Sequence, residues 1–204
     1  MKILVGCEFS GTVRDAFISM GHEAMSCDLL PTQSPGPHFQ GDVLEAIEMD
    51  NWDIGIFHPP CTYLTVSANR WLKDQPIRKS GVLVGEARRE ARREAIEFFM
   101  KLYNCKISKI AIENPIGCMS TEFRKPDQVV QPWMFGHGET KATCFWLRGL
   151  PKLESTNIVP GREQRIFKLG NTEDRWALRS LTFKGIAEAM AKQWGAGNRQ
   201  LLLF

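Results

Sequence analysis

The sequence lacks several features that define particular classes of protein. No two of its six cysteines lie at Cys-x-x-Cys spacing, and no cluster of histidine and cysteine is typical of a zinc site, so no metal ligands are predicted. No apolar run approaches the ~18 residues that a membrane-spanning helix needs. There are no internal repeats. A content of 43% hydrophobic and 24% charged residues argues against long disorder, collagen and coiled coil. We therefore expect an ordinary globular protein without a membrane partner.

A strong excess of positive charge is also missing. Lys and Arg number 26 against 23 Asp and Glu, which gives a formal net charge of +3. A domain that only coats nucleic acid is usually more basic, so local patches must supply any contact with nucleic acid. No hydrophobic leader precedes the first apolar run, Lys2–Cys7. We expect a cytoplasmic protein whose cysteines are reduced, in the cytoplasm of a bacterial host if the chain is phage-encoded.

Apolar runs that are typical of strands alternate with patterns that are typical of helices. Strands are predicted at Lys2–Cys7, His22–Leu29, Trp52–Phe57, Lys109–Ile112 and Lys141–Leu147, and helices from Ser10, from Gly41, over Glu86–Tyr103 and over Phe183–Trp194. This alternation favours an α/β fold with a doubly wound, mostly parallel sheet and helices on both faces. A length of 204 residues suits one domain, which we place at 1–195, with a polar irregular region at 152–180 and a tail at 196–204.

Unusual polar residues follow four of the predicted strands. They are the segment Glu8–Gly11, then Asp28, then Pro59–Cys61, then the pair Glu113 and Asn114. In an open parallel sheet the ligand binds at the carboxyl ends of the strands. The sequence therefore predicts one site that is built from all four strand ends.

Two of these strand ends carry residues that are able to do covalent or acid–base chemistry. Pro59 and Pro60 stiffen the chain before Cys61, which can act as a nucleophile if its thiolate is stabilised; taken alone, the pattern favours a buried structural cysteine. Burial of Glu113 is expected to raise its pKa and let it donate a proton, or the carboxylate caps a neighbouring helix. His58 is expected to form a local hydrogen bond.

Taken in order, these motifs resemble those of DNA (cytosine-5) methyltransferases, in particular small phage- and prophage-type members. The matching residues are Phe9-Ser10-Gly11, Asp28, Gly41-Asp42-Val43, Pro59-Pro60-Cys61 and Glu113-Asn114. The resemblance implies a Rossmann-like fold that binds S-adenosylmethionine or a modified analogue. The implied cofactor residues are Glu8, Phe9, Ser10, Gly11, Asp28, Leu29, Asp42, Val43 and Pro59.

The resemblance also implies a mechanism. Cys61 would add to C6 of cytosine, and a methyl or modified methyl group would then be transferred to C5. Glu113 would contact N3 and the exocyclic amine, and Asn114 would orient the strand-end loop. In a duplex the target base must first leave the stack.

The chain departs from the family at several points. The arginine motif that contacts cytosine O2 is not recognisable, and Lys141 is our first substitute, with Arg165 second. A separate target-recognition domain is missing, and Val13 and Arg14 follow Gly11 in place of further glycines. The basic or aromatic residues expected to contact DNA are Arg70, Trp71, Arg78, Lys79 and Arg165, although a solvated loop after Cys61 would look the same.

Other basic and aromatic residues are assigned structural roles. The arginine run at 88–93 lies at spacings that permit surface pairs with glutamate on the same helix. Trp146, Trp176 and Trp194 are expected to pack in the core.

The last five residues resemble the peptide by which bacterial replication proteins bind the sliding clamp. The matching residues are Gln200, Leu201, Leu203 and Phe204, behind a glycine-containing linker. A frayed or packed apolar terminus is the other reading. The tail also leaves open a second function, that of a non-catalytic DNA-associated relative recruited to replication through the clamp.

Overall fold

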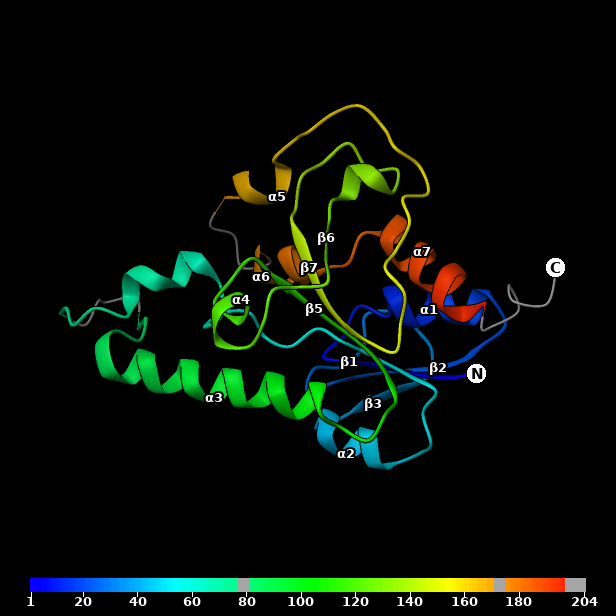
Figure 1. Cartoon of the computed structure of the whole chain (residues 1–204), viewed down its shortest axis with the longest axis horizontal. Coiled ribbons are helices and arrows are strands. Elements are labelled where there is room, and N and C mark those ends of the chain that lie inside the picture. Colours follow the sequence, from blue (N-terminus) through cyan, green and yellow to red (C-terminus); the bar gives the residue numbers. More distant parts are fainter. Residues whose placement is uncertain (77–80, 171–174, 197–204) are drawn as a thin grey trace.

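The structure is a computed structural model that describes residues 1–76, 81–170 and 175–196. Its strands are β1 Lys2–Gly6, β2 Glu23–Asp28, β3 His38–Gln40, β4 Ile54–Phe57, β5 Lys109–Pro115, β6 Gln128–Val130 and β7 Thr143–Arg148. Within the described residues they form one seven-stranded sheet in the order β3-β2-β1-β4-β5-β7-β6 (Figure 1). The first five strands of this order are parallel, whereas β7 runs antiparallel to β5 and to β6. The prediction of a doubly wound, mostly parallel sheet is confirmed.

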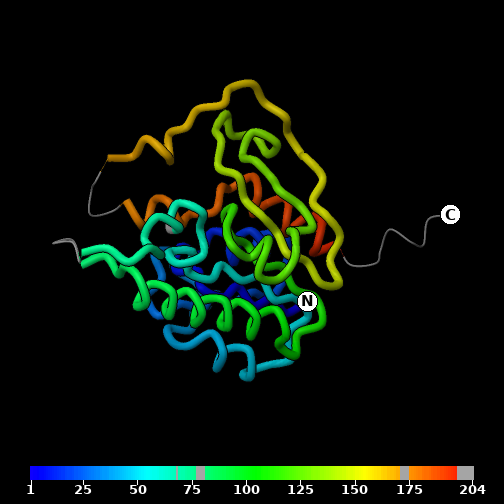
Figure 2. The backbone as a smooth tube through the Cα atoms, turned by 60° about the vertical axis from the view of Figure 1, so that its left-hand side comes forward, coloured from blue at the N-terminus to red at the C-terminus, as the bar shows by residue number. Residues whose placement is uncertain are grey.

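Helices lie on both faces of this sheet. They are α1 Thr12–Ser19, α2 Val43–Glu48, α3 Gly85–Tyr103, α4 Met119–Glu122, α5 Arg165–Lys168, α6 Arg175–Ser180 and α7 Lys184–Gly195, with short 3₁₀ turns η1 Val66–Trp71 and η2 Pro132–Met134. Figure 2 shows α1 and α7 on one side of the sheet and α2 and α3 on the other.

The alternation of side chains along β1 explains the two layers. Ile3 and Val5 point to one side and pack with α1 and α7, while Leu4 points to the other side and packs with α2 and α3. All three are fully buried. A strand that is buried on both faces reads as a continuous apolar run, which is why β1 was recognisable from the sequence.

Some elements differ from the sequence-based predictions. The short strands β3 and β6 were missed, and the region 152–180 contains α5 and α6 rather than irregular chain alone. Trp146 and Trp194 are buried as expected, but Trp176 is 58% exposed, so the prediction of a core position for it was wrong. Trp176 lies on the surface of α6, where its ring stacks at 5.5 Å from that of Phe9.

The described part of the chain has neither a membrane-spanning helix nor a cluster of metal ligands. No helix in it is long and apolar enough to cross a membrane. Nor do three or more histidine, cysteine or acidic side chains gather there in a way that would hold a metal ion.

Candidate active site

Two hydrogen bonds join the segments that follow β4 and β5. Their register pairs Phe57 with Ile112, so the residues beyond each strand end lie side by side. The ring Nδ1 of His58 lies 3.1 Å from Oε2 of Glu113, and Nδ2 of Asn114 donates to the carbonyl oxygen of Pro59 at 2.9 Å. The expected local hydrogen bond of His58 is confirmed. Two motifs that are 55 residues apart are thus fixed against each other at the carboxyl edge of the sheet.

The pKa of Glu113 is perturbed in the direction opposite to the prediction. Burial raises the pKa of Glu113, but the hydrogen bond from His58 and the positive charge of Lys141 outweigh it, and the net pKa lies below its usual value. The prediction treated burial alone and missed the two partners, which are distant in sequence. Glu113 is therefore an ionised hydrogen-bond acceptor at neutral pH.

Cys61 lies beside this carboxylate with an exposed side chain. Desolvation is the largest cause that raises the pKa of its thiol, and the negative charge of Glu113 adds to it. Lys141 and Arg179 act in the other direction, although their effect is smaller. The thiol is thus held in its protonated form in the free protein, between one carboxylate and two cations.

Lys141 and Arg179 both line one pocket, which has a volume of about 450 Å³. Its other lining residues are Gln131, Thr140, Ala142, Gln164, Ile166 and Phe167. Nζ of Lys141 donates to the carbonyl of Leu181 at 3.0 Å, which ties the start of β7 to the segment before α7. Sequence reasoning missed Arg179, because it lies on a helix of six residues with no motif around it, 118 positions beyond Cys61.

Arg165, the second expected substitute for the missing arginine, is engaged elsewhere. Its Nη2 lies 2.9 Å from Oε1 of Glu139 and its Nε lies 3.1 Å from Oε2, so the guanidinium makes a two-pronged ion pair. Lys141, unlike Arg165, is brought close to Glu113 and Cys61.

The turn after β1 is built around the carboxylate of Glu8. Oε1 accepts from the backbone N–H of Val13 at 2.7 Å, and Oε2 accepts from that of Arg14 at 3.3 Å. The side chain is buried, with 5% exposed. Glu8 thus satisfies free N–H groups in the first turn of α1, a local role that accounts for its burial. Ser10 was expected to cap this helix, but the N-cap residue is Gly11, and Ser10 Oγ instead accepts from the N–H of Thr12 at 3.2 Å.

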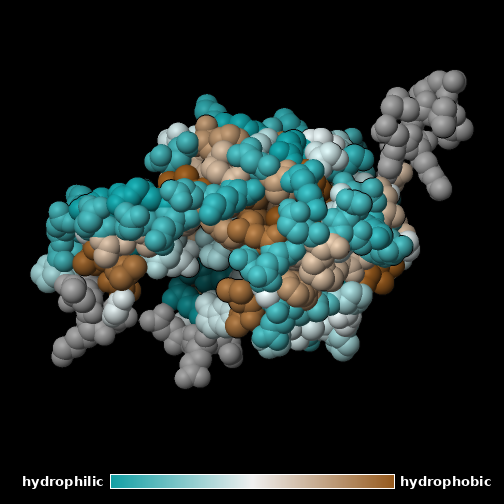
Figure 3. Space-filling model, turned by 90° about the horizontal axis from the view of Figure 1, so that it is seen from below, coloured by the Kyte–Doolittle hydropathy of each residue, from teal (hydrophilic) through white to brown (hydrophobic). Residues whose placement is uncertain are grey.

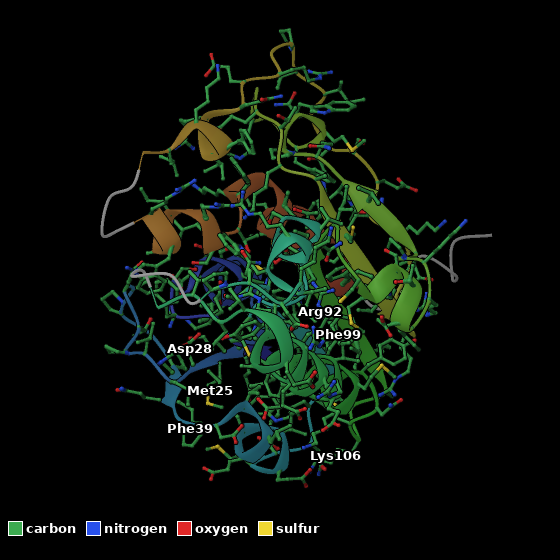
Figure 4. All side chains as sticks on the ribbon, turned by 90° about the vertical axis from the view of Figure 1, so that its left-hand side faces the viewer. Met25, Asp28, Phe39, Arg92, Phe99 and Lys106 are labelled. Atoms are coloured by element: carbon green, nitrogen blue, oxygen red, sulfur yellow. The ribbon has the colours of Figure 1, made fainter. Side chains whose placement is uncertain are left out.

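A second pocket, of about 230 Å³, lies at the ends of β1 and β2. Its lining residues are Cys7, Asp28, Leu29, Gly41, Asp42, Val43, Pro60 and Phe98. Four of the predicted cofactor residues meet here: Asp28, Leu29, Asp42 and Val43. Asp42 also accepts from the N–H of Leu44 at 2.8 Å and so begins α2. Figure 4 looks along α3 and labels Asp28 with its neighbours Met25 and Phe39 on the β2–β3 side.

Phe98 and Cys7 are lining residues that the sequence did not single out. Phe98 comes from α3, seventy positions away from Asp28, so no local pattern marks it. Cys7 ends β1 with φ 59°, a left-handed conformation that non-glycine residues seldom adopt and that is often found at functional sites. Pro60 lines the pocket, whereas the predicted Pro59 is buried and accepts the Asn114 hydrogen bond.

Arg14 braces the loop that follows Asp28 and Leu29. It is fully buried, and its guanidinium donates to Ser26 Oγ at 3.0 Å and to the carbonyl of Ser34 at 2.9 Å. A β-carbon on Gly11, which has φ 75°, would overlap this guanidinium. Gly11 therefore leaves room for Arg14, and the two residues together set the shape of the pocket rim.

The remaining predicted DNA contacts are only partly described. Arg70 and Trp71 lie in η1, where the guanidinium stacks over the indole at 4.7 Å from the ring centroid. The predictions for Arg78, Lys79, Gln200, Leu201, Leu203 and Phe204 fall outside the described residues.

Comparisons with known proteins add little to this geometry. No family model and no curated protein matches the chain. Among the solved structures that match is a candidate DNA modification methyltransferase encoded within a prophage of E. coli, with 13% identity and a TM-score of 0.49. The match covers 84% of this chain and 56% of that chain, so the chain spans just over half the length of that protein.

Proposed function

We propose that the chain transfers a methyl group, or a modified methyl group, from S-adenosylmethionine or an analogue to C5 of cytosine in DNA. The single observation that carries this proposal is the paired edge of β4 and β5. There the bonds from His58 to Glu113 and from Asn114 to Pro59 set a nucleophile-bearing loop beside an ionised carboxylate. The pocket lined by Asp28 lies at the next strand ends.

The smaller pocket has the chemistry that part of this cofactor needs. Leu29, Val43 and Phe98 offer apolar surface for an adenine ring. Asp28 offers a carboxylate at the end of β2, the place where open α/β sheets that bind nucleotides bind ribose hydroxyls. One oxygen of the Asp28 carboxylate, Oδ1, already accepts from the N–H of Leu30 at 3.0 Å. When bound, the cofactor would supply an electrophilic methyl group next to Pro60 and Cys61.

The chain's own residues would then activate the base. As Cys61 Sγ bonds to C6, the thiol proton would pass by way of the Glu113 carboxylate to N3, and Glu113 would accept from the amino group of the base. The neutral adduct would be nucleophilic at C5 and would take the methyl group there. After transfer, solvent would take the C5 proton, N3 would give its proton back by way of Glu113, and the bond between Sγ and C6 would break to restore the aromatic ring and the Cys61 thiolate. His58 and Asn114 position Glu113 and the loop, and touch no reacting atom.

The electrostatics of the site support activation that depends on the substrate. In the free protein the charge of Glu113 helps to hold the thiol of Cys61 protonated. An amino group of a bound base that donates to Glu113 would offset this charge, while Lys141 and Arg179 still favour the thiolate. The nucleophile would thus become reactive mainly when a base is in place.

Contact with DNA rests on local charge. Lys141 and Arg179 flank the larger pocket, and exposed Arg70 lies in the segment after Cys61. These cations suit phosphate groups on either side of an extruded base. The clamp-binding peptide at 200–204 stays a prediction from the sequence.

The test uses DNA that contains 5-fluorocytosine, whose fluorine cannot leave as the C5 proton does and which therefore traps the adduct. Wild type with S-adenosylmethionine should give a DNA-linked protein band, and Cys61→Ser should give none. Cys118→Ser, a half-buried cysteine on α4's edge, is the matched control and should behave like wild type. Absence of the adduct in wild type, or its persistence in Cys61→Ser, would refute the proposal.

A further inference from the structure

The arginine run on α3 does more than form surface pairs. Arg93 does pair with Glu86 and Glu90 on its own helix, as the sequence suggested. Arg89 also pairs with Glu86, but Arg88, Arg89 and Arg92 all reach the segment that follows Cys61. The expectation that the whole run serves only surface pairs was wrong.

Three guanidinium groups donate to main-chain carbonyls of this segment. Arg88 Nη2 donates to Thr62 O at 2.7 Å, Arg92 Nε to Tyr63 O at 2.9 Å, and Arg89 Nη1 to Leu72 O at 2.7 Å. These carbonyls lie in a turn and at the end of a short 3₁₀ helix, where regular backbone partners are few.

All three arginines make a second contact with the same segment, and that of Arg89 is a bond from Nη2 to Asp74 Oδ1 at 3.1 Å. The Arg88 guanidinium also lies over the ring of Tyr63, 4.5 Å from its centroid. Arg92 spans two acceptors, because its Nη2 donates to Asn69 Oδ1 at 2.8 Å. A planar fork of donors makes this double contact possible, and lysine could not reproduce it.

Burial shows that these contacts are part of the packed structure. Arg88 is only 6% exposed, and among the described residues its Nε is buried without a hydrogen-bond partner. Burial of a cation with one unsatisfied donor is unfavourable and is offset only where the other contacts hold it firmly. Figure 4 labels Arg92 on α3 together with Phe99, whose ring is in the core. Figure 3 shows the hydrophilic surface that extends over this side of the molecule.

The opposite side of the segment is held by the loop after β5. Cys118 N–H donates to Leu64 O at 2.8 Å, and Thr65 bridges to Gly117. Between the two sides the turn closes on the nucleophile itself, because the N–H groups of Leu64 and Thr65 donate to the carbonyl of Cys61 at 3.0 and 3.1 Å. The residues after Cys61 are thus held from two sides.

We propose that Arg88, Arg89 and Arg92 form a clamp, here called the α3 clamp, that holds the segment after Cys61 in position so that the thiol faces the substrate. They are positioning residues, since they act through the loop backbone and touch no reacting atom. The catalytic consequence of the α3 clamp rests on the proposed function. The holding of the segment by the α3 clamp can be tested whether or not the protein has that function.

The test compares two arginines on the same helix, in the full chain. Arg92→Gln removes a clamp residue, whereas Arg93→Gln removes only surface pairs and is the matched control. Arg88 is buried and its loss endangers folding, so Arg92 carries the test. The first measurement is hydrogen exchange at the amides of Leu64 and Thr65, which reports on the turn whether or not methyl transfer occurs.

We expect Arg92→Gln to speed exchange at these two amides about tenfold, which corresponds to the loss of about one charged hydrogen bond. Exchange in α7 should not change. With 5-fluorocytosine DNA, the rate of adduct formation and kcat should fall about tenfold by the same reasoning, at unchanged affinity for S-adenosylhomocysteine. Arg92→Lys should recover only part of the rate.

Three outcomes would overturn the clamp. One is equal exchange at Leu64 and Thr65 in Arg92→Gln and Arg93→Gln. The second is faster exchange with an unchanged adduct rate, which would leave the contacts purely structural. The third is loss of S-adenosylhomocysteine binding in parallel with the rate, which would indicate general disruption. A wild type that forms no adduct but whose exchange responds to Arg92→Gln would refute the proposed function and leave the holding of the segment intact.

Discussion

Replacement of Arg14 by methionine gives the most direct measure of how the rim of the smaller pocket is held. Arg14 is fully buried and ties the loop after Asp28 to β2 and to the start of α1. Methionine keeps much of the volume and removes the guanidinium. The effect therefore reports on hydrogen bonds and charge rather than on a large cavity.

The magnitude follows from the individual contacts. The two short bonds within the loop and sheet are to Ser26 Oγ at 3.0 Å and to Ser34 O at 2.9 Å. Neither acceptor is left alone, since Ser26 also contacts His38 Nδ1 and Ser34 O also accepts from Thr32 Oγ1. Each bond from a charged donor contributes roughly 1.5–3 kcal/mol, and release of a buried cation offsets part of the sum, so we expect a net loss of about 2–3 kcal/mol.

The assay is unfolding in urea, with Arg93→Met as the matched control. Arg93 is exposed and pairs only with glutamates of its own helix in the described contacts, so its replacement should change stability by less than about 0.5 kcal/mol. In a protein of this size the Arg14 variant should melt about 5–10 °C lower. If the two variants differ by less than about 0.5 kcal/mol, Arg14 does not brace the loop as described.

Three further predictions concern the nucleophile and the tail. Glu113→Gln removes a charge that raises the pKa of Cys61, so iodoacetamide should alkylate Cys61 faster at a given pH, and the pH profile of alkylation should move towards lower pH. Methyl transfer should be lost. An unmoved pH profile would contradict the electrostatic account. Gly117→Ala places a β-carbon against the carbonyl oxygen of Leu64, so we expect a free energy of unfolding in urea that is about 1–3 kcal/mol lower, and slower adduct formation. Gly170→Ala is the control and should be neutral, because a β-carbon there meets nothing within 4 Å. Deletion of residues 200–204 should abolish binding to a bacterial sliding clamp in a pull-down and leave S-adenosylhomocysteine affinity unchanged; retained clamp binding would exclude the tail as its site.

The doubly wound, mostly parallel sheet could be predicted because the signal is local. β1 and β4 are short apolar runs buried on both faces, and β5 holds the buried apolar run 110–112. Polar residues lie at or just after the ends of these runs and at the end of β2. The edge strands β3 and β6 have three residues each and half-exposed side chains, so they carry no such pattern. Asp28 was predicted from its strand end and Asp42 from the family resemblance, and both line the smaller pocket.

The residues that tune the site could not be predicted, because their effect depends on approach in space. Burial of Glu113 was correctly expected, but the direction of its pKa shift is decided by His58 and Lys141. The same holds for the arginines of α3. The sequence pattern at positions 88–93 fits two kinds of contact, and both are present. One is a pair with Glu86 or Glu90 at helical spacing, and the other is a contact with a loop that lies more than twenty residues away in the sequence.

Trp176 and Arg179 show where this limit matters most for function. Both lie on α6, in a region whose sequence looked irregular, and they bring an exposed indole next to Phe9 and a cation next to Cys61. A six-residue helix has too few turns to show an apolar stripe, and its tryptophan therefore looked like a core residue. Since Arg179 opposes the effect of Glu113 on the thiol, the region 152–180 supplies positive charge close to Cys61. Removal of that charge by Arg179→Met should move the pH profile of Cys61 alkylation towards higher pH, opposite to Glu113→Gln, and a shift in the same direction for both variants would show that α6 does not reach the site.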